Sequence, residues 1–264
     1  MLMEVKKELK VFILSFKYAV MREMLNKTTF ITNILFMILN NASFIVQWII
    51  LYSLKSNIGG YSLKEVLLLW ALAASTYGVA HLFFENAFNL SDIINNGKLD
   101  SYIVQPKNIL LSSITSEIKI SAIGDILYGY IILFIYGITI KNFLLFTLFT
   151  ITGGLLFVSI IIIINSLSFW INNADLIADT EERLLVQFAT YPDGIFKGIT
   201  KILLYSIIPV GIINYIPIKL IINFDYKLLL LILLITIFLV VLANIIFNNG
   251  LKRYSSSNLM SARI

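Results

Sequence analysis

Five long apolar stretches dominate this sequence and restrict the chain to a membrane-embedded fold. They lie at 28–54, 63–87, 121–138, 143–171 and 228–247. As helices, each is long enough, or nearly so, to cross about 30 Å of hydrocarbon. Only 13% of the residues are charged, against about 25% in a soluble domain, so polar side chains are too few to cover a water-soluble globule. The sequence therefore predicts an all-α integral membrane protein, with one transmembrane domain over residues 1–264.

A sixth apolar stretch, at 202–222, is interrupted by Pro209, Gly211 and Pro217, and a partly polar segment at 172–201 precedes it. Two interpretations of this region are open. Either 172–201 is a cytoplasmic helix and 202–222 spans the membrane, or 174–190 is a polar span and 202–222 dips back into the outer leaflet. Both interpretations give six membrane segments with the last one running inward. The third stretch can also be extended back toward Ile109, through Glu117 and Lys119.

The distribution of Lys and Arg predicts the orientation of these segments, because cytoplasmic loops are enriched in both residues. With the N-terminus inside, the first interpretation places fifteen of the 20 basic residues in the cytoplasm and five outside. The second interpretation places thirteen inside and seven outside. Either way, both termini are predicted to be cytoplasmic.

The first 25 residues are predicted to form an amphipathic helix that lies in the inner interface of the membrane. Charges are spread throughout them, which is unlike a cleavable signal peptide. One arc of this helix is apolar, and lysines beside it can reach lipid headgroups. The apolar arc consists of Val5, Leu9, Phe12, Phe16 and Val20. The alternative is a cytoplasmic helix that packs on protein.

Motifs for enzymatic chemistry are few. The chain has no Cys, one His and no phosphate-binding loop, so we expect no ATP binding by this chain alone and no cofactor or metal of its own. Asp175 and Asp179 follow Asn173 at a spacing that membrane prenyltransferases use to hold magnesium against a diphosphate. The sequence has no second acidic cluster to face these aspartates. This absence favours the interpretation that both are hydrated charges at the edge of the membrane. A membrane-embedded, prenyltransferase-like enzyme that uses Asp175 and Asp179 is the alternative function.

Polar residues inside the apolar stretches are costly in a membrane and are therefore candidates for function. They fall into three stripes at helical spacing. The first is Asn26, Asn33, Asn40 and Gln47; the second is Tyr77, His81 and Glu85; the third is Glu117, Ser121, Asp125 and Tyr128. Each stripe could form interhelical hydrogen bonds or line a hydrated route for a substrate. The candidate pathway-lining residues are Asn33, Asn40, Gln47, Tyr77, His81, Glu85, Glu117 and Asp125.

The loop at 86–108 is the strongest local feature. Leu90, Ile93 and Ile94 form the apolar ridge of a short amphipathic helix, and Gly97 stands where that helix should stop. Pro106 bars Gln105 from continuing a helix. A short cytoplasmic helix between two spans suits a docking element for a motor protein, and a plain interfacial turn is the alternative.

These features together resemble the permease subunits of ABC transporters of the type-2 exporter superfamily. The resemblance is to a branch of bacterial permeases often encoded as two related permeases with one ATPase, and it covers nearly all of the chain. It is carried by the runs YGVAHLFFENAFNLSDIINNGKLDSYIVQPKN, SLSFWI, YPDGIFKG, IIPVGIINYIPIKLI and GLKRYSSSN.

The resemblance implies that the loop helix at 90–97 is the coupling helix, seated in a groove of an ATPase, and that 191–222 forms an outer re-entrant gate. The coupling residues would be Leu90, Ser91, Asp92, Ile93, Ile94, Asn95 and Gly97. Two copies of the ATPase would carry ATP and magnesium, and a second permease protomer, identical or paralogous, would complete the pathway.

The predicted function is therefore the transmembrane subunit of an ATP-driven exporter in the bacterial cytoplasmic membrane. It is not an enzyme, and it provides half of a translocation pathway. Its expected partners are the ATPase, the second protomer and membrane lipids, and no nucleic acid. The sequence does not identify the cargo, although the intramembrane acids argue against an anionic one.

Overall fold

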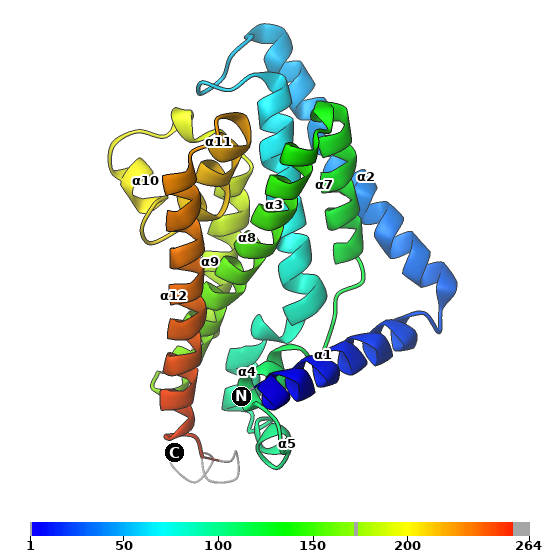
Figure 1. Cartoon of the computed structure of the whole chain (residues 1–264), viewed down its shortest axis with the longest axis vertical. Helices are drawn as coiled ribbons and strands as arrows, with labels where there is room; N and C mark the ends of the chain where they lie inside the picture. The colour runs from blue at the N-terminus through cyan, green and yellow to red at the C-terminus, as the bar shows by residue number, and fades with distance from the viewer. Residues whose placement is uncertain (1, 172–173, 256–264) are drawn as a thin grey trace.

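The computed structural model describes the backbone of residues 2–171 and 174–255, and the side chains of these ranges apart from 2–11 and 15. The regular secondary structure of this part of the chain is helical, and it contains no strand (Figure 1). The predicted all-α class is therefore confirmed. Of the predicted interfacial arc, Val5 and Leu9 lie outside the described side chains.

The helices follow the predicted apolar stretches closely in the first half of the chain. They are α1 (Leu2–Glu23), α2 (Lys27–Leu54), α3 (Leu63–Phe84), η1 (Glu85–Ala87), α4 (Leu90–Asn95), α5 (Asp100–Ile103), α6 (Ile109–Ile114) and α7 (Ala122–Gly137). Residues 115–121 are not helical. The extension of the third stretch back to Ile109 as one helix is therefore wrong.

The second half begins with the long helix α8 and ends with the long helix α12. Its elements are α8 (Ile140–Ser166), η2 (Leu167–Phe169), α9 (Ala174–Ala189), η3 (Asp193–Ile195), α10 (Gly198–Leu203), the π-helical segment η4 (Gly211–Tyr215), α11 (Ile216–Ile222) and α12 (Tyr226–Leu251). The broken stretch at 202–222 is thus divided among α10, η4 and α11. Proline explains much of this division, because Pro209 and Pro217 lack the N–H that a continuous helix needs.

Polar side chains fix where the long helices begin. The Thr29 N–H donates to Asn26 Oδ1 at 3.1 Å before α2, and the Asn142 N–H donates to Thr139 Oγ1 at 3.1 Å before α8. Before α12, the Lys227 N–H donates to Asp225 Oδ1 at 2.8 Å. These caps satisfy N–H groups that have no partner within the helix.

Four helical segments of the described chain are long and apolar enough to cross a membrane. They are 27–54, 63–95, 140–169 and 226–251. Two further apolar helices, 122–137 and 211–222, are shorter. The structure thus establishes several apolar helices of membrane length, while the count of six spans stays a prediction.

Helices α3, α7, α8 and α12 run back and forth along the long axis of the molecule (Figure 1). The N-terminal end of α1, the C-terminal end of α12, and the short helices α4 and α5 all lie at one end of the molecule, and α10 and α11 lie toward the other. We call these the terminal end and the distal end. Helix α9 runs between the two ends beside α8, and α1 lies across the terminal end.

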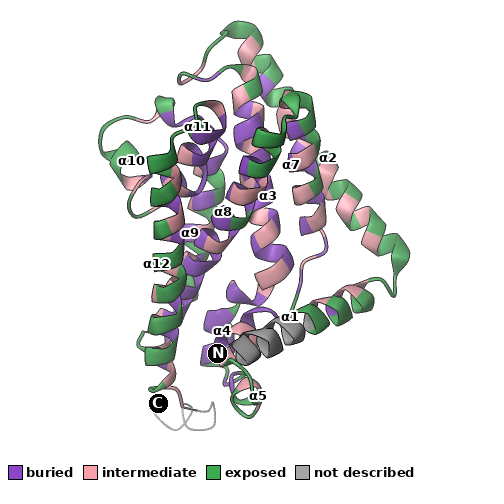
Figure 2. Ribbon diagram, in the orientation of Figure 1, coloured by how far each residue is buried: buried purple, intermediate pink, exposed green. Residues whose placement is uncertain are grey.

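Helices α3 and α8 form the centre of the bundle, and α2 and α12 are its most exposed long helices (Figure 2). Small residues let the central helices approach closely. A Cβ at Gly129 of α7 would lie 1.8 Å from Ser75 Oγ, and one at Gly154 of α8 would lie 2.7 Å from Val79 Cγ1. Glycine is therefore required at both contacts.

Helix α1 packs on protein through the described part of its predicted apolar arc. The Phe16 ring lies 5.0 Å from that of Phe83, and the Phe12 ring lies 6.0 Å from it. Apolar side chains next to this arc remain bare, including Ile13, Tyr18 and Met21, at 52–65% exposure. The face available to lipid thus lies beside the arc that the sequence indicated.

Candidate functional site

A cavity of about 590 Å³ lies among the helices of the bundle. Its walls come from α2, α3, α7, α8, α9 and η4. Its lining contains aliphatic, aromatic and polar side chains. The lining includes Asn40, Asn41, Phe44, Trp70, Thr76, Tyr77, Asp125, Phe157, Glu182, Arg183 and Asn214.

Asp125 is the buried acid of the cavity wall, with 4% exposure. Asn41 of α2 donates from Nδ2 to Asp125 Oδ1 at 2.6 Å, and Asn41 Oδ1 accepts from Trp70 Nε1 at 3.3 Å. This chain of bonds joins α7, α2 and α3. Asp125 Oδ2 has no hydrogen-bond partner, which leaves one acceptor of the pair free.

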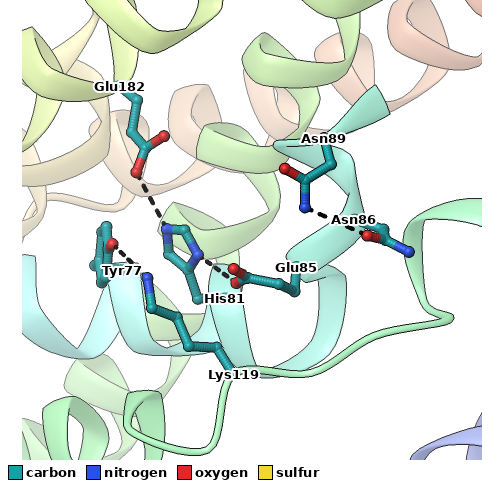
Figure 3. Close-up of polar contacts among 7 residues, drawn as sticks. All are labelled: Tyr77, His81, Glu85, Asn86, Asn89, Lys119 and Glu182. Carbon is teal, nitrogen blue, oxygen red and sulfur yellow. Dashed lines mark hydrogen bonds and ion pairs between the residues drawn. The ribbon is translucent and has the colours of Figure 1, made fainter. Parts of the chain in front are cut away.

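His81 forms a second polar cluster, at the side of α3 that faces α9 (Figure 3). Its Nδ1 lies 2.6 Å from Glu85 Oε2, and its Nε2 lies 3.4 Å from Glu182 Oε1. The ring is buried and stacks on Phe88 with a centroid separation of 3.9 Å. His81 thus connects α3 and α9 with the segment that leads into α4.

Lys119 approaches the same cluster from the non-helical segment before α7. Its Nζ donates to Tyr77 Oη at 3.2 Å (Figure 3), and its backbone N–H donates to the His81 carbonyl at 3.2 Å. Lys119 is therefore tied to α3 through the Tyr77 hydroxyl and the His81 carbonyl.

The structure brings together some of the predicted pathway residues and separates others. Asn40, Tyr77 and Asp125 line the cavity. Gln47 lines an adjoining groove of about 220 Å³ that shares Phe44 and Trp70 with it. His81 and Glu85 belong to the second polar cluster, which we call the His81 cluster and which also contains Glu182, Tyr77 and Lys119. Asn33 is exposed on α2.

Glu117 does not take the predicted place. It is exposed and lies in the non-helical segment 115–121, so it does not share a helical face with Asp125. The physical reason is the break before α7, which begins only at Ala122. Glu117 is also absent from the cavity lining.

The apolar ridge of α4 faces inward. Leu90 and Ile94 are 0% exposed and Ile93 is 5% exposed. They pack on α8, η2 and α9 of the same chain. Ser91 is also buried and shares a 2.5 Å hydrogen bond with Ser168 of η2. The prediction that this ridge is presented to a partner's groove is therefore wrong, because the ridge anchors α4 to its own bundle.

The opposite side of α4 is polar and open. Asp92, Asn95 and Asn96 are exposed, and Lys98 Nζ lies 2.6 Å from Asp92 Oδ2. The helix stops as predicted at Gly97, which has a φ of 71°. The Gly97 N–H donates to the Ile94 carbonyl and the Lys98 N–H to the Ile93 carbonyl, a Schellman motif.

Beyond α4, the loop 86–108 exposes two consecutive apolar residues, Ile103 and Val104, which we call the apolar step. Ile103, the last residue of α5, is 42% exposed, and Val104 is 82% exposed. Tyr102 is held by a hydrogen bond to Ser116 Oγ at 2.9 Å. At the tail, Tyr254 donates to Asp100 Oδ1 at 2.9 Å. Both bonds hold α5 in place.

Sequence reasoning missed a polar latch at the distal end. Asp193 is 3% exposed and accepts from Tyr61 Oη at 2.9 Å, Tyr205 Oη at 3.0 Å and Lys219 Nζ at 2.5 Å. The latch joins the α2–α3 loop, η3, the turn after α10, and α11. Burial by itself would raise the pKa of Asp193, but these hydrogen bonds and the charge of Lys219 hold it below its ordinary value. Tyr61 and Lys219 are 158 positions apart in the sequence, so no local pattern links the four residues of the latch.

Asp175 and Asp179 do not form a metal site. Both are exposed on α9, and the described residues contain no group of three or more acidic or His side chains that could hold a metal ion. Asn173, the third member of that pattern, lies outside the described residues. The prenyltransferase-like alternative has no support.

The family model described as "ABC-2 family transporter protein" matches residues 14–258. The chain belongs to the ABC-2 transporter family. No curated protein and no solved structure matches it. The match runs from within α1 to beyond α12, so it includes the cavity, the His81 cluster, α4 and the latch. The protein is thus a transport permease of the membrane, in keeping with its apolar helices.

Proposed function

We propose that this permease forms half of the translocation pathway of an ATP-driven exporter and that a separate ATPase drives it. The family match over 14–258 carries this proposal, because it makes the chain a transporter component and the sequence holds no phosphate-binding loop. ATP and magnesium would bind to the ATPase, two copies of which would serve two permease protomers. The transporter would reside in the bacterial cytoplasmic membrane.

The polar stripe of α2 supports a second protomer. Asn33, Asn40 and Gln47 are exposed along a helix of membrane length, and amides that face lipid are unfavourable. An amide is both a donor and an acceptor, so such a stripe can pair with a copy of itself or with a paralogue. The second protomer would cover α2 and enclose the cavity, whichever of the two it is.

The fifth membrane segment is proposed to be α9, with α10, η4 and α11 as an outer re-entrant gate. Helix α9 runs between the two ends of the molecule, and the following helices stay toward the distal end (Figure 1). Glu182 supports this assignment, since it faces His81 inside the bundle. The latch at Asp193 would then hold the gate.

The loop 86–108 is proposed to transmit the motion of the ATPase. The ATPase would contact the polar side of α4 and the apolar step of Ile103 and Val104, which lie at the terminal end (Figure 1). Because the inner side of α4 packs on α8 and α9, a push on this loop would reach the cavity wall. A two-state rocking of the protomers would follow.

Co-purification with the ATPase tests the proposal. We expect the full-length permease, expressed with its native partners, to retain an ATPase through purification, and Val104→Asp to reduce the retained amount at least tenfold. A central apolar anchor typically contributes about 2 kcal/mol or more to binding. Ser56→Asp, which adds the same charge in an exposed distal loop, should retain it fully. If no ATPase accompanies the native permease, the proposed function fails.

Cysteine labelling tests the proposed orientation. This orientation rests on the excess of Lys and Arg in the segments that we place in the cytoplasm. The chain has no native Cys, so single substitutions report cleanly. In intact cells, an impermeant maleimide should label Ser56→Cys and spare Asn95→Cys, and after permeabilisation it should label both. Labelling of Asn95→Cys from outside would place loop 86–108 and the termini outside the cell and refute the topology.

A further inference from the structure

We propose that a groove between α1 and the loop 86–108 binds the headgroup of an anionic phospholipid, taken from the membrane leaflet at the terminal end. The chemistry that the groove recognises is a phosphate ester with a net negative charge. The bare apolar side of α1, beside the groove, makes the membrane rather than solution its source. The inference goes beyond the proposed function and does not depend on the ATPase.

The groove has a volume of about 410 Å³, within the usual range for small-molecule sites of roughly 300–1,000 Å³. Helix α1 forms one wall, and the loop 86–108, α6 and the residues just after α6 form the other. The first wall is held on the bundle by Ala19, which is buried in a small apolar cluster with Ile118 and Ile120.

Hydrogen bonds within the protein hold the second wall in place. Tyr102 Oη donates to Ser116 Oγ at 2.9 Å, and Ser116 Oγ donates to the Ser113 carbonyl at 2.8 Å. Gln105 Nε2 donates to the Ser101 carbonyl at 2.7 Å. Because these donors are already paired, the wall keeps its shape without a ligand, and other groups have to provide the binding.

Two basic side chains provide the charge of the groove, and its described lining contains no acid. Arg22 of α1 and Lys107 of the loop are both exposed, so a ligand in the groove can reach their N–H groups. Lys107 Nζ has no partner among the described residues.

The guanidinium of Arg22 is also largely available. Its Nε lies 3.7 Å from Glu23 Oε1, and the two side chains are 59% and 39% exposed. Such an exposed pair is weak, and it leaves the outer N–H groups, which can bind a phosphate through two parallel hydrogen bonds. The half-buried Ser112 adds a hydroxyl to the same lining. These groups together favour an anion with several acceptor oxygens.

The position of α1 favours a lipid over a soluble phosphate. Helix α1 lies across the terminal end (Figure 1), and α2, which is of membrane length, begins four residues after α1 ends. The C-terminal part of α1 therefore lies level with the membrane edge. Its bare apolar side includes Ile13, Tyr18 and Met21, at 52–65% exposure, and Tyr18 also lines the groove. A lipid headgroup in the groove would thus place its acyl chains along this side, as in interfacial helices.

Native mass spectrometry of the full-length permease in detergent tests the inference. The probes are dioleoyl phosphatidylglycerol, which is anionic, and dioleoyl phosphatidylcholine, which has the same chains and no net charge. Glycerol 3-phosphate is a phosphate ester without acyl chains. We expect the first phosphatidylglycerol to bind at least tenfold more tightly than phosphatidylcholine, since each basic residue near an anionic lipid surface contributes about fivefold. An excess of glycerol 3-phosphate, about a hundredfold, should not displace it.

Four charge-removing variants locate the headgroup. Arg22→Gln and Lys107→Gln should each weaken binding of phosphatidylglycerol about fivefold and change that of phosphatidylcholine little, and the double variant should bind both lipids equally. Lys17→Gln in α1 and Lys98→Gln in the loop remove the same charge outside the described lining, and both should bind as the wild type does. All four side chains are exposed, so the thermal unfolding midpoint should be preserved in each variant.

Each alternative outcome overturns a defined part of the inference. Equal binding of the two lipids by the wild type would refute the anionic ligand. Equal losses in all four single variants would show a diffuse attraction between surface lysines and lipid in place of a site. Displacement of phosphatidylglycerol by glycerol 3-phosphate would make the ligand a soluble phosphate and refute the lipid source.

Discussion

Replacing Ile94 by Asp is expected to unfold the permease rather than only to uncouple it from an ATPase. Ile94 is 0% exposed and packs against the central helices. An uncompensated charge at such a position costs about 3–5 kcal/mol, in addition to the lost apolar contact. This is a large part of a typical folding stability of about 5–15 kcal/mol. The measurement is the thermal unfolding midpoint and the yield of monodisperse protein in detergent.

The adjacent residue is the matched control for Ile94. Asn95 lies on the exposed side of the same helix, so Asn95→Asp should leave the midpoint within a few degrees of the wild type. If Ile94→Asp is as stable as Asn95→Asp but loses its ATPase, then the ridge of Leu90, Ile93 and Ile94 does contact the partner, and the inward packing of α4 is incorrect.

The second large effect is expected at the distal latch. Asp193→Ala removes the acceptor of two tyrosine hydroxyls and the ion partner of Lys219. We expect a loss of about 3 kcal/mol in unfolding free energy, at the lower end of the range for a broken buried pair, because Lys219 is 48% exposed and stays hydrated. The decrease in the thermal unfolding midpoint in detergent measures this loss.

Asp100→Ala serves as the control for the latch. Asp100 also accepts from a tyrosine hydroxyl, Tyr254 Oη, but at an exposed site, so its loss should cost less than about 1 kcal/mol. Equal effects of Asp100→Ala and Asp193→Ala would show that burial of the Asp193 cluster does not stabilise the distal end.

The same latch predicts a dependence on pH. Because the folded-state pKa of Asp193 lies below its ordinary value, its stabilisation is complete above the unfolded pKa of about 4 and is lost as the pH falls toward the folded value. The wild type should therefore lose stability below about pH 4 by a step that Asp193→Asn lacks. A parallel decline in both proteins would contradict this.

Much of the fold could be predicted from hydropathy alone, because an unbroken apolar stretch has few other options in a membrane. The bounds of α2, α3, α8 and α12 follow the apolar stretches, and the stop at Gly97 follows from its backbone freedom. The exception is 109–121, where apolar residues suggested one helix and the chain forms α6 and an irregular segment instead. The Lys119 backbone N–H bonds there to the His81 carbonyl, a partner that no local pattern reveals.

The candidate site was predicted less completely. Asp125 and Tyr77 were identified because a polar residue in an apolar stretch is conspicuous. Asn41 was passed over because its neighbour Asn40 fits the seven-residue stripe, yet Asn41 is the one that bonds to Asp125. Glu182 belonged to an acidic segment that sequence could not place inside or outside the membrane.

Hydropathy and short sequence runs are sufficient to predict a helical membrane protein, the positions of its long helices and the resemblance to a transporter permease. Which side of each helix faces protein depends on tertiary packing. Helix α4 shows why: an amphipathic pattern states that one side will be buried, and it does not state against what. The ridge of Leu90, Ile93 and Ile94 packs inward on α8 and α9 of the same chain, and the polar side of α4 is exposed.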